Sequence, residues 1–94
     1  MAKATGESAA SYSDITSSTL VTRGAGKLLG IFVASASSTP TIKVWDQTSA
    51  GSPVIVNTFT PVGANFYRIP ARFKNGLFVT ISGTVDCTVF YEQS

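Results

Sequence analysis

The stretch from Gly76 to Glu92 alternates apolar and polar residues in steps of two, which constrains the fold more than any other feature. This alternation is typical of β-strands with one buried face. In its middle, Ser82-Gly83-Thr84 has the composition of a turn. We therefore expect two strands joined as a hairpin, whose three-residue loop keeps both apolar sets on one face. The apolar positions are Leu77, Val79, Ile81, Val85, Cys87, Val89 and Tyr91.

The other face of this predicted hairpin would meet water. Thr80, Asp86 and Thr88 suit that position, but Phe78 and Phe90 lie on the same side. Two phenylalanines on the outer face of a small soluble domain indicate a surface that something covers.

Turn residues divide the preceding chain into further short strands, and no segment has a helical period of useful length. With 44% hydrophobic residues over 94 positions, one domain with a modest core is expected. We predict an all-β fold, a single antiparallel β-sandwich (jelly-roll-like or Ig-like) of about seven to eight strands over residues 19–94. Besides the hairpin, strands are predicted at 20–23, 27–35, 41–47, 54–60 and 64–69.

Residues 1–18 differ from the rest, because Ala, Ser, Thr and Gly dominate there. We interpret them as an extended N-terminal arm. Such an arm is either a frayed terminus or a segment that lies along a neighbouring subunit, with Tyr12 and Ile15 as its anchors.

Trp45 is a third aromatic residue expected on an outer face, because Ile42 and Val44 define the buried side of its strand. Three explanations remain open for Trp45, Phe78 and Phe90. They are buried against a partner subunit, covered by loops or the arm of the same chain, or part of a sugar-stacking site. In the last case Asp46 and Gln47 would supply hydrogen bonds beside the indole ring.

The charge pattern argues against nucleic acid, since the net charge is only +2 and no dense stripe of basic residues exists. The one local basic cluster, Arg68, Arg72 and Lys74, is either a solvated rim or a patch that docks on an acidic protein surface. No run approaches the roughly 20 apolar residues of a membrane span. The N-terminus lacks a signal-peptide pattern, so synthesis in the cytoplasm is expected.

Residues for catalysis and metal binding are scarce. The chain has no histidine, and its five acidic residues are scattered. The single cysteine, Cys87, allows no internal disulfide and is expected in the core. We predict no enzymatic activity, no metal and no cofactor.

Several stretches resemble small accessory proteins of tailed bacteriophages, a group of short all-β proteins that includes capsid decoration (cement) proteins. The resemblance lies in Gly26-Lys-Leu-Leu-Gly-Ile-Phe-Val, Thr41-Ile-Lys-Val-Trp-Asp, Val56-Asn-Thr-Phe-Thr-Pro and the run from Gly76 to Tyr91. It implies a structural protein of the virion head surface that binds the major capsid protein and forms a homo-oligomer, with a trimer favoured.

The expected function is therefore capsid stabilisation by binding between capsid subunits. Trp45, Phe78, Phe90, Tyr12 and Ile15 would form the interface. Two alternatives remain open: a receptor- or carbohydrate-binding module of a head or tail fibre, and a structural component of the tail or connector.

Overall fold

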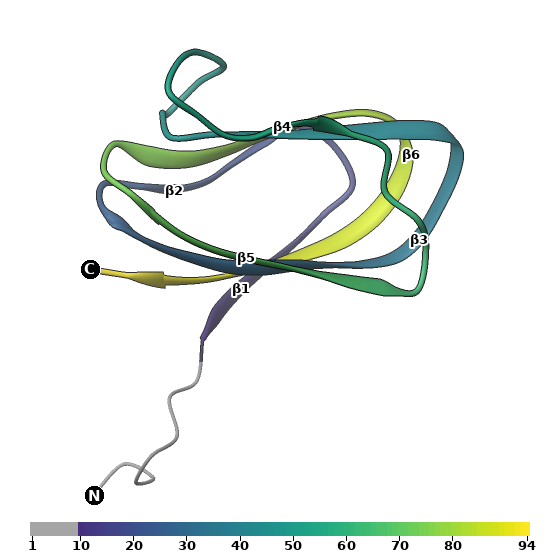
Figure 1. Ribbon diagram of the computed structural model, residues 1–94, viewed down its shortest axis with the longest axis horizontal. Helices are drawn as coiled ribbons and strands as arrows, with labels where there is room; N and C mark the ends of the chain where they lie inside the picture. Colours follow the sequence, from purple (N-terminus) through teal and green to yellow (C-terminus); the bar gives the residue numbers. More distant parts are fainter. Residues whose placement is uncertain (1–9) are drawn as a thin grey trace, which may run out of the picture.

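The computed structural model describes residues 10–94, which form six strands and no helix (Figure 1). All strand pairings are antiparallel. Within this part of the chain there is accordingly no helix capable of crossing a membrane. The strands are β1 (Ser11–Ile15), β2 (Thr19–Arg23), β3 (Gly26–Trp45), β4 (Val54–Phe59), β5 (Asn65–Phe73) and β6 (Gly76–Gln93).

The two long strands, β3 and β6, pair with each other along their length and bend together (Figure 1). Ser37 pairs with Thr84 and Thr41 with Ser82, so three residues of β3 bulge out opposite Gly83. Gly83 has a φ of 82° and Thr39 a φ of 47°, both in the left-handed region that turns a chain sharply. Each long strand thus contributes one half to each of two layers.

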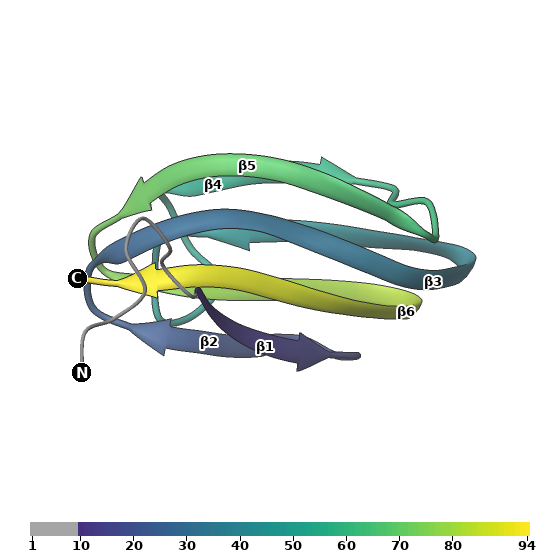
Figure 2. The same ribbon diagram turned by 90° about the horizontal axis from the view of Figure 1, so that it is seen from below.

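One layer has the strand order β1–β6–β3–β5 and the other has β2–β6–β3–β4 (Figure 2). When the halves of β3 and β6 are counted separately, the chain has eight segments. The first pairs with the eighth, the second with the seventh, the third with the sixth and the fourth with the fifth. This nested pairing is that of a jelly roll. The predicted antiparallel sandwich is confirmed, in its jelly-roll form and not its Ig-like form.

The hydrophobic core lies between the two layers and is built from the inward side of each strand. In β6 the buried side chains stand at odd positions on both sides of the bend, and Cys87 is among them as predicted. The buried apolar residues are Ile15, Leu28, Ile31, Val33, Ile42, Val44, Phe73, Leu77, Val79, Val85, Cys87 and Val89.

The predicted hairpin at Ser82-Gly83-Thr84 is wrong, because residues 76–93 form one bent strand. The strands predicted at 27–35 and 41–47 likewise merge into β3. The strand predicted at 64–69 continues through Pro70 to Phe73. Pro70 lies in β5, at the edge of its layer, where a missing N–H disturbs the ladder least.

The predicted boundary of the N-terminal arm at residue 18 is also wrong. Ser11 pairs with Tyr91 and Ile15 with Cys87, so the sandwich begins at β1. Residues 1–9 of the predicted arm lie outside the described residues.

Candidate functional site

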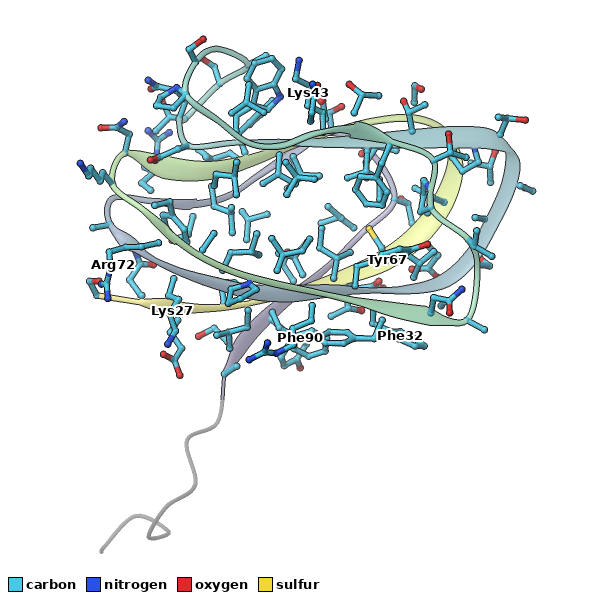
Figure 3. All side chains as sticks on the ribbon, viewed as in Figure 1. Lys27, Phe32, Lys43, Tyr67, Arg72 and Phe90 are labelled. Atoms are coloured by element: carbon cyan, nitrogen blue, oxygen red, sulfur yellow. The ribbon has the colours of Figure 1, made fainter. Side chains whose placement is uncertain are left out.

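The most prominent surface feature is an apolar patch on the outer face of the β1–β6–β3–β5 layer. We call it the phenylalanine face and define it by Leu29, Phe32, Phe66 and Phe90. Together with Ala10 these side chains surround a shallow hollow of about 470 Å³. Figure 3 shows Phe32 and Phe90 projecting from this layer away from the core, whereas Tyr67 projects into it. The patch therefore faces solvent and not the sandwich interior.

Strand register brings these side chains together from three strands. Phe32 of β3 lies opposite Phe66 of β5, while Phe90 of β6 lies opposite Gly30. A bulge between Leu28 and Gly30 adds Leu29 to the outer side. Phe66 is 51% exposed and Phe32 is 39% exposed, which is high for phenylalanine.

Gly30 makes room for the ring of Phe66. A Cβ atom at Gly30 would collide with the Phe66 ring and would lie 2.7 Å from the backbone oxygen of Tyr67. The Phe66 ring lies over this glycine and meets Phe90 edge-on, with ring centroids 6.2 Å apart. This is a favourable aromatic geometry, so the patch is held in shape by its own contacts.

Charged residues flank the patch on two opposite sides. Arg68 and Arg72 lie on the exposed side of β5, and Lys27 pairs across the sheet with both Arg72 and Glu92. On the other side, at β1 and β6, stand two carboxyl groups, Asp14 and Asp86. The hydrogen bond that protonated Asp86 donates to Asp14, together with the repulsion between the two charges, raises the pKa of Asp86.

The aromatic residues predicted to share one face are divided between two. Phe78 lies opposite Trp45 on the β2–β6–β3–β4 layer, whereas Phe90 lies on the opposite side of the sandwich. The prediction of a common face is wrong because it depended on the hairpin. Leu20 and Val54 continue the same cross-strand line. We call Leu20, Phe78, Trp45 and Val54 the tryptophan row.

The groups expected beside Trp45 in a sugar site have other partners. Asp46 is buried and accepts hydrogen bonds from the amides of Lys74 and Asn75, at 2.8 to 3.1 Å. Gln47 donates to the carbonyl of Ser52. These two side chains hold the loops at this end of the sandwich.

The indole of Trp45 is itself engaged. Its Nε1 donates to Oγ1 of Thr80 at 3.2 Å, and the ammonium of Lys43 lies 4.3 Å from the ring centre. This is a cation–π contact, so one face of the indole is occupied by Lys43.

The remaining predicted site residues lie in four different environments. Ile15 is 5% exposed and belongs to the core, so its prediction as an intersubunit anchor is wrong. Tyr12 is 70% exposed and lies opposite Phe90, at the border of the phenylalanine face. Arg68 and Arg72 share the outer side of β5, but Lys74 lies in the β5–β6 connection, so the basic cluster is only partly a spatial one.

Sequence reasoning missed Leu29, Phe32 and Phe66. A signal existed for the first two, because residues 28–34 are apolar on both sides of the strand. For Phe66 the signal lies only in the register that places it beside Phe32.

A smaller hollow of about 200 Å³ opens between the edge strands β4 and β5. Phe59 and Tyr67 lie within it with ring centroids 5.2 Å apart, and the Tyr67 hydroxyl accepts a hydrogen bond from the amide of Val62. Its lining is mostly apolar and continuous with the core, so it is a gap at the sandwich edge. The lining residues are Val56, Phe59, Tyr67, Arg68 and Ile69.

Comparison with known proteins found no matching family model, no similar curated protein and no similar solved structure. Within residues 10–94, no group of three or more histidine, cysteine, aspartate or glutamate side chains is placed to hold a metal ion. Among the described residues, the phenylalanine face is therefore the candidate functional site.

Proposed function

We propose that this chain is a structural protein of a bacteriophage virion, most specifically a capsid decoration protein that stabilises the head by binding between subunits. The observation that carries the proposal is the phenylalanine face. It exposes large apolar side chains on a rigid sheet, beside charges that can orient a protein partner.

The physical basis of such a role is burial of apolar surface. Removing one large aromatic side chain from water contributes on the order of 2 kcal/mol. Phe32 and Phe66 are each about half exposed, so a partner gains a substantial part of that amount from each. Repetition over a symmetric shell multiplies a contact that is weak by itself.

The fold is compatible with this role but does not select it. Jelly rolls occur in viral capsid proteins, lectins and cupins. Because one fold serves many functions, the surface and not the fold indicates the function. The surface favours protein binding over sugar binding, since Asp46 and Gln47 are engaged within the chain.

In the proposed role the partners are the major capsid protein and further copies of this chain, and the location is the outer surface of the head. The chain would contribute contacts only, with no chemical step. Burying both the phenylalanine face and the tryptophan row would allow one subunit to bridge two neighbours.

The test is cosedimentation with emptied phage capsids. Phe66→Ser should reduce the bound fraction several-fold, because the variant removes the most exposed ring of the face. Val62→Ser is the matched control, since Val62 is 59% exposed but lies in the β4–β5 connection. Equal retention of wild type and Phe66→Ser would contradict the proposed surface. Failure of wild type to sediment with capsids would contradict the proposed function.

A further inference from the structure

We propose that the phenylalanine face binds the same face of a second copy of this chain, about a two-fold axis that lies in the plane of the contact. The inference rests on the proposed function in taking this face as the working surface, and it names the partner of that face. Its evidence is the distribution of charge around the patch.

The positive and negative groups lie at diagonally opposite corners of the layer. Asp14 of β1 is in register with Phe32 of β3 and Phe66 of β5, so the three residues form one row across the layer. Arg68 and Arg72 lie on β5, at the opposite edge of the layer from β1. Their partners on β3 are closer to the start of that strand than Phe32 is. The apolar side chains occupy the space between the two corners.

A face-to-face two-fold contact exchanges these corners. When the axis runs along the other diagonal, the arginines of one copy meet Asp14 and Asp86 of its partner. Symmetry then forms the same contact a second time. The phenylalanine faces meet between the two charged contacts, with Phe66 close to the axis. A patch with opposite charges at opposite corners is self-complementary in this sense.

The corner formed by Asp14 and Asp86 is the part of the layer that such a partner stabilises most. The pairing of β1 with β6 places Asp14 and Asp86 side by side, and their hydrogen bond and charge repulsion raise the pKa of Asp86. An arginine from the second copy relieves this repulsion, and it binds a carboxylate well because of its planar, forked geometry.

The N-terminal segment of the same chain is a poorer occupant. It leads into Ala10 at the border of the hollow, but among residues 1–9 only Met1 has a large apolar side chain. That segment cannot supply the apolar surface that four large side chains require.

The size of the face sets the strength of the contact. Strand β5 has nine residues and β1 has five, and the parts of β3 and β6 in this layer are about as long as β5. With about 3.3 Å per residue and about 4.8 Å between strands, the layer covers roughly 500 Å² per copy. The total of roughly 1,000 Å² is near the lower limit for a specific interface. We therefore expect a dimer that dissociates on dilution.

The experiment is sedimentation velocity over a range of concentrations with two complementary charge variants. The first, Arg68→Asp with Arg72→Asp, has acidic groups at both corners. The second, Asp14→Arg with Asp86→Arg, has basic groups at both. Wild type should shift from monomer to dimer with concentration. Each variant alone should associate at least about tenfold more weakly, because like charges then meet twice.

The decisive sample is the equimolar mixture of the two variants. Every corner contact in the mixed dimer joins opposite charges, so the dimer mass should return. A wild type that remains monomeric, a trimer, variants that dimerise like wild type, or a mixture that fails to associate would each overturn the proposal. Far-UV circular dichroism checks that both variants are folded, and the wild-type result stands without them.

This test is independent of the test for function. If wild type is monomeric yet cosediments with capsids, the two-fold contact is wrong and the virion role stands. If wild type dimerises but does not cosediment with capsids, the virion role is wrong and the two-fold contact stands.

Discussion

Asp14 and Asp86 show how strand pairing creates an electrostatic property that neither residue has alone. They are 72 positions apart in sequence, and the pairing of β1 with β6 brings them to one corner of the phenylalanine face. Asp14 then raises the pKa of Asp86 through a hydrogen bond and through charge repulsion. The folded chain consequently holds a proton on Asp86 more tightly than the unfolded chain does.

This linkage predicts a pH effect on stability. The contribution of Asp86 is fully present below its ordinary pKa and is lost as the pH rises through the raised, folded-state pKa. Asp14→Asn removes the repulsion. We expect this variant to be more stable than wild type at pH 7, with the difference shrinking towards pH 4.

The measurement is the midpoint of urea unfolding at the two pH values, at concentrations too low for association. Glu92→Gln is the control, because Glu92 lies on the same layer without being a cause of the Asp86 shift. An identical pH dependence for wild type and Asp14→Asn would count against the coupling.

At the scale of strands, the common bend of β3 and β6 makes the sandwich. Gly83 holds this corner with a φ of 82°, and a Cβ atom there would lie 2.7 Å from Cα of Pro40. Both the left-handed backbone and the close approach favour glycine.

Gly83→Ala should therefore destabilise the fold by about 1–3 kcal/mol, through backbone strain and contact with Pro40. Gly51→Ala is the matched control, because Gly51 has no atom within 4 Å of its would-be Cβ and no positive φ. Its effect should stay within about 0.5 kcal/mol. Chemical denaturation of both variants provides the comparison, and equal stabilities would show that the bend tolerates a side chain.

The same element explains what could be predicted from the sequence. A hairpin with a three-residue loop between Ile81 and Val85 puts these two side chains on the same face. A single strand with unbroken alternation does the same, so the sequence pattern fits both arrangements. Both arrangements place the apolar side chains at odd positions between 77 and 91 on the inward face, so this part of the core is predictable. The position of Phe78 relative to Phe90 was not, because a hairpin puts them on one face and a bent strand puts them on two.

Local patterns also leave the long-range pairs undetermined. Phe90 was predicted on an outer face from its own strand, and the structure gives it Phe66 as a neighbour. Nothing near Phe66 in sequence indicates that contact, which depends on the pairing of both β5 and β6 with β3. The sequence around Ile15 does not indicate a strand, because β1 is only five residues long and its partner is distant in sequence.

At the scale of the whole molecule, the sandwich has two outer faces of different character. The tryptophan row is partly covered by its own contacts, with Trp45 bonded to Thr80 and lying under Lys43. The phenylalanine face is more open and has charges of opposite sign on its two sides. We therefore assign association to the phenylalanine face.

Hydroxyl-radical footprinting of the isolated chain and of its associated form tests this assignment most directly. We expect the oxidation of Phe32 and Phe66 to fall to a small fraction on association, while the oxidation of exposed Val62 stays unchanged. If Phe32 and Phe66 are oxidised equally in both states, the phenylalanine face is not the surface through which this protein acts.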